Sequence, residues 1–205
     1  MISDIARPPK LKDRILRLLN ERRVMTISTN RADGWPQATM VGYVNDGFFL
    51  YCFVAANSQK HANILRDRRV SIAIGSDASQ PLDIKGLSAA ATASVVTDQS
   101  EFDYICKLRL GRFPEYVSLP APVLREDAVQ RILPHPTSAG VVLLRIAPEI
   151  ISMLDYSKGF GHSDLITFSE RDLDLHIKSL RHRWDDNAVA DPPLTELPSV
   201  LCERK

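Results

Sequence analysis

The sequence predicts an α+β fold that is mainly β, with six or more strands and a few flanking helices. Many apolar residues fall in short runs rich in β-branched and aromatic residues, bounded by turn-forming residues. Asp46-Gly47 lies between two such runs, residues 36–44 and 48–54, and an Asp-Gly pair in that place is a strong hairpin signal. Apolar residues at helical spacing are confined to a few stretches. These patterns together favour a sheet with helices around it.

The first half of the chain is predicted to begin with a helix and to continue as strands. Leu11, Ile15 and Leu18 recur at helical spacing, which predicts an amphipathic helix over residues 11–22. That helix is expected to cover one end of a barrel. The strands that follow are expected at residues 24–29, 36–44, 48–54, 70–74 and 84–96.

The connection between the third and fourth strands contains a candidate anion-binding corner. Asn57 or Ser58 is placed to cap a helix that runs to about Arg66, and Lys60 and His61 fall in its first turn. Cations there oppose the helix dipole, which favours negative charge at an N-terminus. A bound phosphate would resolve that conflict, because free N–H groups, the Ser58 hydroxyl and the Lys60 ammonium converge on it. An ordinary capped connector with a solvated lysine explains the same residues.

The second half of the chain is predicted to alternate helices with closing strands. Periodic apolar residues predict a helix over residues 98–110, which Gly111 ends, and prolines bound a shorter helix over residues 124–132. Pro148 is expected at a bend between two strands, because proline has no N–H group for a ladder. The remaining elements are expected at 141–146 and 150–154 as strands, and at 172–184 as a strand or a helix.

This order of elements resembles the pyridoxamine 5′-phosphate oxidase-like family, most specifically in Ser58-Gln59-Lys60 followed by Arg69-Val70-Ser71. The resemblance covers residues 11–155 and implies a split β-barrel that binds FMN, usually as a homodimer. In that family the serine, the next residue and the lysine hold the flavin phosphate, which assigns that role to Ser58, Gln59 and Lys60. Gln59 stands where an arginine is common, so one charge of the phosphate clamp is missing.

The resemblance implies further cofactor contacts on the second strand, whose backbone lies along the isoalloxazine ring in the family. Thr39 occupies a position that is arginine in the true oxidase. The residues that match this strand are Thr39, Met40, Val41 and Gly42.

Two more strands are implied to reach the cofactor. Tyr51 and Cys52 match a tyrosine-threonine pair beneath the ribityl chain. Gly86 stands near a family glutamine that touches the ring, so main-chain groups, Lys85 or Ser88 would have to serve there. Lys85 beside the N1–C2 edge would stabilise the negative charge of reduced flavin. A solvent-facing strand lysine is the alternative.

The resemblance divides the chain into residues 1–156, the split-barrel flavin-binding domain with its N-terminal helix, and residues 157–205. The second part is expected to be an extension packed on the barrel or on the partner subunit. Gly159-Phe160-Gly161 and His162 resemble a segment that follows the barrel in some haem-utilisation relatives. Phe160 would then stack near the flavin while His162 donates a proton. A tight turn around a buried aromatic plug is the competing interpretation.

Composition argues against several functional classes. With 26 basic and 25 acidic side chains, the net charge of +1 provides no global field for nucleic acid. Cys52, Cys106 and Cys202 are too few and too scattered for a disulfide framework or a thiolate zinc site, and the histidines show no paired metal spacing. No run approaches the roughly 20 apolar residues of a membrane span, and no signal peptide is recognisable. We therefore expect a soluble, cytoplasmic protein without a metal, nucleic-acid or membrane site.

The sequence and the resemblance together predict an FMN-dependent oxidoreductase that acts on an unidentified small molecule as a homodimer. No catalytic residue is assigned, since the flavin carries the chemistry in such proteins. Deazaflavin, which relatives also use, and haem are the alternative cofactors. Two other hypotheses stay open: a dimeric module that binds flavin or haem without turnover, and a flavin-free barrel for another ligand.

Overall fold

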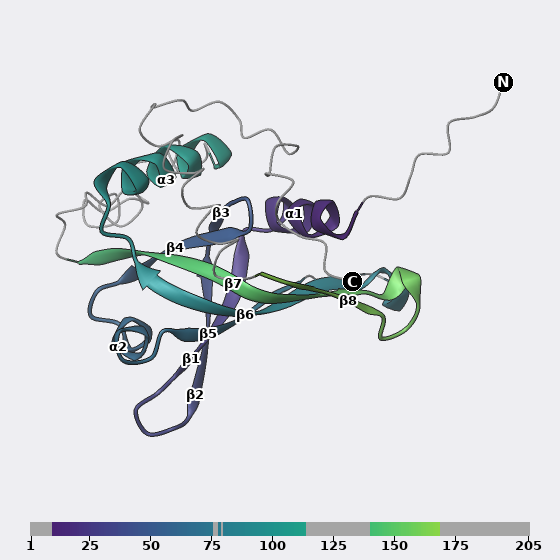
Figure 1. Cartoon of the computed structure of the whole chain (residues 1–205), viewed down its shortest axis with the longest axis horizontal. Coiled ribbons are helices and arrows are strands. Elements are labelled where there is room, and N and C mark those ends of the chain that lie inside the picture. Colours follow the sequence, from purple (N-terminus) through teal and green to yellow (C-terminus); the bar gives the residue numbers. More distant parts are fainter. Residues whose placement is uncertain (1–9, 76–77, 79, 114–139, 169–205) are drawn as a thin grey trace, which may run out of the picture.

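The strands of this protein form a single antiparallel sheet that curls on itself (Figure 1). The computed structural model describes residues 10–75, 78, 80–113 and 140–168. The elements are α1 (Leu11–Glu21), β1 (Val24–Asn30), β2 (Pro36–Gly42), β3 (Val44–Asp46), β4 (Phe49–Ala55), α2 (Gln59–Arg66), β5 (Arg69–Gly75), η1 (Pro81–Asp83), β6 (Lys85–Val95), α3 (Gln99–Arg112), β7 (Val141–Asp155), η3 (Tyr156–Lys158) and β8 (Ser163–Thr167).

The order of the strands explains why the sheet curls. Neighbouring strands follow the path β2-β1-β5-β6-β7-β4-β3, and β8 pairs with β7 beside this path. The two strands at its ends, β2 and β3, are consecutive in the chain and are separated only by Tyr43, so the sheet must bend until its ends approach. The Tyr43 hydroxyl donates to the Leu19 carbonyl oxygen at 2.9 Å and ties this junction to α1. The predicted fold, mainly β and a split barrel with flanking helices, is confirmed.

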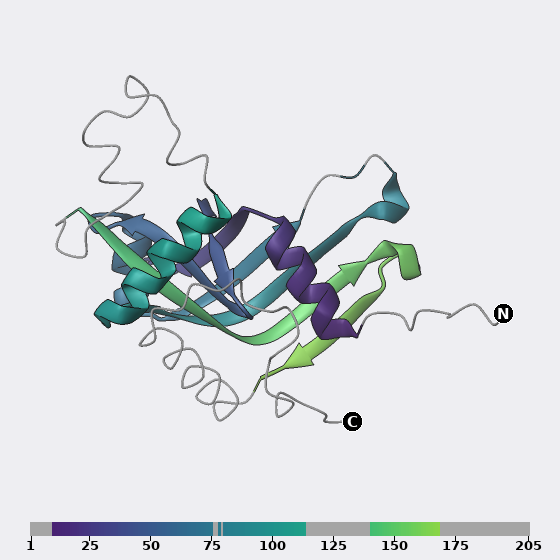
Figure 2. The ribbon, with the colours of Figure 1, turned by 90° about the horizontal axis from the view of Figure 1, so that it is seen from above.

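Two hydrophobic clusters hold the barrel and its helices together. The larger one lies between α1 and the inner face of the sheet, where Ile15, Leu19, Ile27 and Ile72 are essentially inaccessible to solvent. The smaller one lies beneath α3, and its members include Phe49, Tyr51, Phe102, Ile105 and Leu143. The α1 helix covers the inner face of the sheet, and α3 packs on the outer face of β4 and β7, at the other end of the molecule (Figure 2). The outer face of β1, β5 and β6 is left open over much of its area.

The structure differs from the sequence-based prediction of the elements at four places. The strand predicted over residues 36–44 is two strands. β2 pairs with β1 and ends at Gly42, whereas β3 pairs with a different strand, β4. The strands predicted over 141–146 and 150–154 are the single strand β7. Glu149, which follows Pro148, is the extra residue at a bulge opposite Ala90 and Ala91, so the strand bends without breaking. The α3 helix also continues through Gly111 to Arg112.

The fourth correction is an added strand, β8, which pairs with β7 and extends the sheet beyond residue 156. Its neighbour Phe168 joins the larger hydrophobic cluster. The elements predicted at 124–132 and 172–184 lie outside the described residues, as does most of the expected C-terminal extension. In the described part of the chain, the helices are too short or too polar to cross a lipid bilayer.

Candidate functional site

The start of α2 has the local structure that its sequence predicts. Ser58 is the N-cap in an extended conformation, and its Oγ accepts a hydrogen bond from the His61 backbone N–H at 3.3 Å. The first turn contains no acidic residue and carries Lys60 and His61. The His61 ring is fixed by its Nδ1, which lies 2.7 Å from the Ala56 carbonyl oxygen. The corner therefore concentrates positive charge and N–H groups, which suits an anion.

A buried polar network joins this helix to β1 and β2. The Asn63 side chain is almost fully buried, and its Nδ2 donates to Thr29 Oγ1 at 3.0 Å and to Gln37 Oε1 at 3.1 Å. Gln59 Nε2 donates to Asn63 Oδ1 at 2.9 Å. The Gln59 amide is thus already used within the protein. Sequence reasoning missed Asn63, although a polar residue next to Ile64 on the buried side of a short helix was a usable signal.

Thr39 places a polar atom beside this network without a partner. It lies two residues after Gln37 on β2, and residues at that spacing point to the same side of a strand. Its Oγ1 is buried and makes no hydrogen bond among the described residues. A buried unpaired hydroxyl is costly, so such an atom calls for an explanation. A ligand that accepts a hydrogen bond from the Thr39 hydroxyl would explain it.

The other residues predicted on β2 differ in exposure. Met40 is 75% exposed and Gly42 is exposed, whereas Val41 is half-buried against the larger hydrophobic cluster. Among the described strands β2 has one ladder neighbour, β1, so its second edge carries backbone groups outside the ladder. These groups are available to a ligand or to another chain.

Tyr51 and Cys52 lie in the protein interior, each only 1% exposed. The Tyr51 hydroxyl donates to Glu101 Oε1 at 3.0 Å beneath α3, away from the corner. Burial raises the pKa of the Cys52 thiol to about 12, although the positive charge of Lys60 acts in the opposite direction. Neither side chain is open to a cofactor in this structure, and the assignment of both to the site stays a prediction.

Lys85, Gly86 and Ser88 do not share one face of β6. Gly86 and Ser88 belong to the open face of the sheet, while Lys85 lies on the same side as the buried Leu87 and lines a cavity under α1. Asn63 of α2 contacts Thr29, and the cross-strand row of Thr29 reaches β6 at Ala91. Lys85 is six residues from Ala91 along β6, about 20 Å away. The structure does not bring Lys85 to the Ser58 corner of the same chain.

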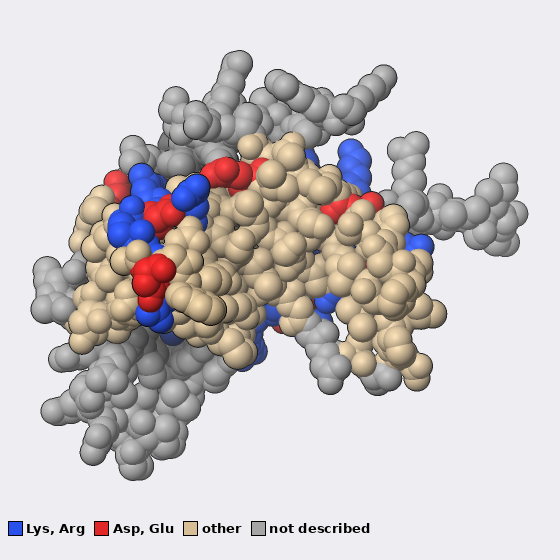
Figure 3. Space-filling view, turned by 90° about the horizontal axis from the view of Figure 1, so that it is seen from below, with Lys and Arg blue, Asp and Glu red and all other residues tan. Residues whose placement is uncertain are grey.

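The open face of the sheet is built from small residues. In one cross-strand row the four central residues are small, with a larger apolar residue at each end: Met40, Thr26, Ala73, Ser88, Ser152 and Leu165. A shallow hollow of 570 Å³ lies near one end of this face, lined by small residues such as Ser28, Ser71 and Ala90. Figure 3 shows the side turned away from α1 and α3, where most of the surface carries no charged side chain. Such a face suits a flat ligand or a second protein surface.

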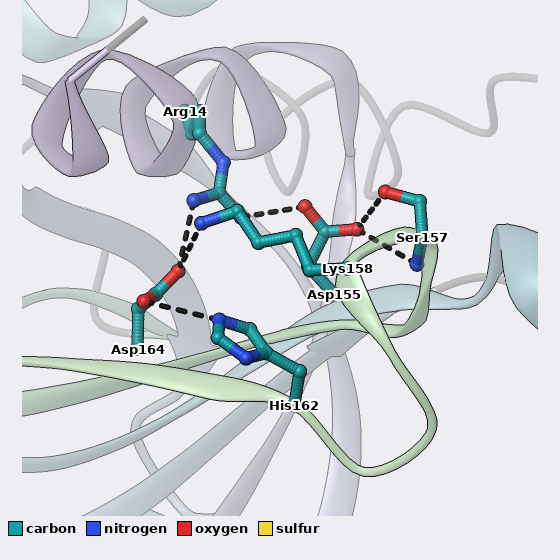
Figure 4. Close-up of polar contacts among 6 residues, drawn as sticks. All are labelled: Arg14, Asp155, Ser157, Lys158, His162 and Asp164. Atoms are coloured by element: carbon teal, nitrogen blue, oxygen red, sulfur yellow. Dashed lines mark hydrogen bonds and ion pairs between the residues drawn. The ribbon is translucent and has the colours of Figure 1, made fainter. Parts of the chain in front are cut away.

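The glycine-bracketed aromatic forms the turn between β7 and β8. Gly159 and Gly161 have φ values of 133° and 75°, which favour glycine. Phe160 is 84% exposed and contacts Tyr156 with ring centroids 4.9 Å apart, so the tight turn is present but the aromatic is not buried. His162 Nε2 lies 3.2 Å from Asp164 in a charged cluster below α1 (Figure 4).

The part of the chain that the structure describes contains no group of three histidine, cysteine, aspartate or glutamate side chains arranged to hold a metal ion.

Fold and corner together define a class of protein: a split β-barrel with a capped, cation-bearing helix start beside one end strand of its sheet. A family model described as pyridoxamine 5′-phosphate oxidase matches residues 11–152, which is more than half of the chain. The chain belongs to this family. A comparison with curated proteins gave no match.

Several solved structures share the fold. A conserved hypothetical protein from Mycobacterium tuberculosis is 24% identical, with a TM-score of 0.56, and the match covers 77% of this chain and 92% of that one. The haem storage protein HutZ from Vibrio cholerae is 22% identical, with a TM-score of 0.51 and coverages of 69% and 92%. A haem binding protein from Mycobacterium smegmatis is 18% identical, with a TM-score of 0.58 and coverages of 80% and 60%. At these identities the likeness concerns the fold alone.

Proposed function

We propose that this chain is an FMN-dependent oxidoreductase of the pyridoxamine 5′-phosphate oxidase-like type, acting on a small molecule. The observation that carries the proposal is the unpartnered, buried Thr39 hydroxyl on the strand that contacts α2, together with a helix start that bears Lys60 and no acidic residue. A phosphate ester accepts hydrogen bonds and attracts cations, so it satisfies both features at once. Family membership supports the same assignment.

The residues of the corner fit a flavin phosphate in defined roles. Lys60 would supply the countercharge, Thr39 a hydroxyl donor, and the first turn of α2 its N–H groups. Gln59 would contribute through its backbone, since its side-chain amide is bonded to Asn63. The backbone edge of β2 would support the ring. When bound, FMN supplies two-electron transfer, and the protein contributes orientation and electrostatics.

A homodimer is part of this proposal. The small-residue face of the sheet is open, and β2 is an end strand whose Gln37 contacts α2, so a second copy that covered this face and edge would close the pocket over the flavin. The scarcity of charged side chains on that side agrees with a surface that is buried in an assembly (Figure 3).

The first test is the identity of the ligand that the purified protein carries. We expect mass spectrometry of the released ligand to give FMN, and a deazaflavin would change the cofactor but not the phosphate site. Because Lys60 provides a charged contact, Lys60→Ala is expected to weaken FMN binding about tenfold or more in a fluorescence titration. Lys12→Ala, on α1, serves as the control and should bind FMN as the parent does.

Thr39→Val makes the test sharper, because the two side chains have nearly the same shape. Removing an unpaired buried hydroxyl should leave the stability of the apo protein unchanged or raised, while FMN binding weakens. Full FMN affinity in both Lys60→Ala and Thr39→Val would refute the proposed phosphate site.

Haem binding without turnover is the second candidate, because two structures with this fold are proteins described as haem binding or haem storing. The absorption spectrum of the purified protein separates the two candidates. A flavin spectrum supports the oxidoreductase, and an intense Soret band supports the haem module.

A further inference from the structure

A cavity of 640 Å³ lies between α1 and the end of the sheet where β6, β7 and η3 meet. This volume is in the range of small-molecule sites. Its apolar lining comes from Leu11 and Leu18 of α1 and from Met153 of β7. The cavity is separate from the α2 corner, since Lys85 at its wall is about 20 Å along β6 from the row that contacts α2.

One wall of the cavity is a charge cluster whose members satisfy one another (Figure 4). Arg14, only 13% exposed at its side chain, donates from Nη2 to Asp155 at 2.5 Å and from Nη1 to Asp164 at 2.8 Å. The Ser157 backbone N–H and hydroxyl also donate to Asp155, and Lys158 Nζ donates to Asp164 at 2.8 Å. Both carboxylates are therefore neutralised by neighbours, and the wall is held in one arrangement.

Two further cations of the lining are not bonded into this cluster. In the described ranges, neither the Arg17 side chain on α1 nor the Lys85 side chain on β6 makes a hydrogen bond or a close ion pair. Lys85 lies opposite Asp155 in the ladder, and its charge helps to lower the pKa of that carboxyl. Glu21 is the one acidic lining residue outside the cluster, so the lining as a whole has four basic and three acidic side chains, a net charge of +1. Arg17 and Lys85 come from two different elements around one cavity, which also has an apolar part.

We propose that this cavity binds a small organic anion, with its anionic head between Arg17 and Lys85 and its apolar body against Leu11, Leu18 and Met153. A cationic pair beside an apolar surface recognises a carboxylate or a phosphate monoester on a short hydrocarbon chain. The Arg14 cluster fixes the geometry of the wall, and its acids already accept hydrogen bonds from Arg14, Ser157 and Lys158. This site is independent of the proposed flavin site.

The test uses the full chain, with and without added FMN, in calorimetric titrations with octanoate, n-octyl phosphate and 1-octanol. We expect either anion or both to bind and 1-octanol, which has a matching chain, to bind at least about tenfold more weakly. The stronger anion identifies the head group as carboxylate or phosphate. The presence of FMN should not change these results, which separates this inference from the proposed function.

Variants locate the binding. Arg17→Ala and Lys85→Ala should each weaken the preferred anion about tenfold. Both residues are exposed, so the variants should fold, which circular dichroism checks. Lys12→Ala, on the same helix but outside the lining, should bind as the parent does. Failure of both anions to bind, equal binding of 1-octanol, or unchanged binding in both cavity variants would overturn the proposal.

Discussion

At the scale of single residues, a buried carboxylate holds α3 to the sheet. Glu101 is 2% exposed and accepts hydrogen bonds from the Tyr51 hydroxyl and, through both its oxygens, from Arg145 Nη1, each at 3.0 Å. Burial raises the pKa of Glu101, although the positive charge of Arg145 opposes this shift. Burial also raises the pKa of Tyr51 well above its ordinary value, so its hydroxyl stays a donor. The position of α3 depends on this arrangement.

Tyr51→Phe is expected to lower the free energy of unfolding by about 1–3 kcal/mol, because a hydrogen bond to a buried charged group is lost. Urea denaturation measures the change. Tyr156→Phe, at a half-buried tyrosine without a hydroxyl bond among the described residues, should leave stability unchanged. FMN affinity of Tyr51→Phe should equal that of the parent, and a large loss of affinity would show that Tyr51 belongs to the cofactor site.

The part of the candidate site that sequence could predict is the part set by local chemistry. The Ser58 cap follows from a cap residue before a short helix, and neighbours within four residues decide it. The Tyr51 side chain points toward Glu101, which is 50 residues away in sequence. The Lys85 side chain points into the cavity that α1 covers. Such tertiary contacts leave no local pattern, so these directions had to come from the structure.

At the scale of elements, period and turn signals located most of the strands, and strand pairing set their limits. Gly42 ends β2 because the antiparallel partner strand β1 begins opposite it, at Val24. The continuity of β7 through Pro148 depends on its pairing with β6 on one side and β8 on the other. No single-sequence pattern specifies a partner strand, and β8, with only five residues, carried too weak a signal.

Two glycines provide an element-scale test of packing. A Cβ at Gly86 would lie 3.0 Å from the Ile74 carbonyl oxygen on the neighbouring strand, so Gly86→Ala should lower the free energy of unfolding by about 1–3 kcal/mol. A Cβ at Gly111, inside α3, would meet no atom within 4 Å. Gly111→Ala should therefore raise the free energy of unfolding by about 0.5–1 kcal/mol, because alanine favours the helix more than glycine does. Thermal denaturation compares the two variants. A Gly86→Ala protein as stable as the parent would contradict the close contact between Gly86 and the Ile74 carbonyl oxygen.

The link between α1 and β8 should be sensitive to acid. Hydrogen bonds from Lys158 and Arg14 lower the pKa of Asp164. A lowered folded-state pKa gives stability that is present above the unfolded value of about 4 and is lost as the pH falls below it. Asp164→Asn should therefore be less stable than the parent at neutral pH, and the difference should shrink below about pH 4. Denaturation at several pH values checks this.

The control for this series is Asp83→Asn, at an exposed position in η1. Its difference from the parent should be small at every pH. A gap between Asp164→Asn and the parent that stays constant into acid would mean that the ion pairs contribute nothing to folding.

At the scale of the whole molecule, α1 covers the inner face of the sheet and α3 covers part of its outer face, while the rest of the outer face stays open. Ala73 sits near the centre of the open face, in the row that joins Met40 to Leu165. If a second copy covers this face, Ala73→Arg should give a monomer in light scattering, because a charge would be buried without a partner. Gln99→Arg, exposed on α3, should not change the mass. A dimeric Ala73→Arg would exclude this face as the interface.

The length of β7 links the stability of the two halves of the barrel. Leu143 belongs to the cluster beneath α3 and Leu144 to the cluster beneath α1, so successive side chains of one strand enter different cores. The same strand forms ladders with β4, β6 and β8. If one core unfolded alone, β7 would lose partners on which the other core also depends. The domain should consequently unfold in one cooperative step rather than in halves.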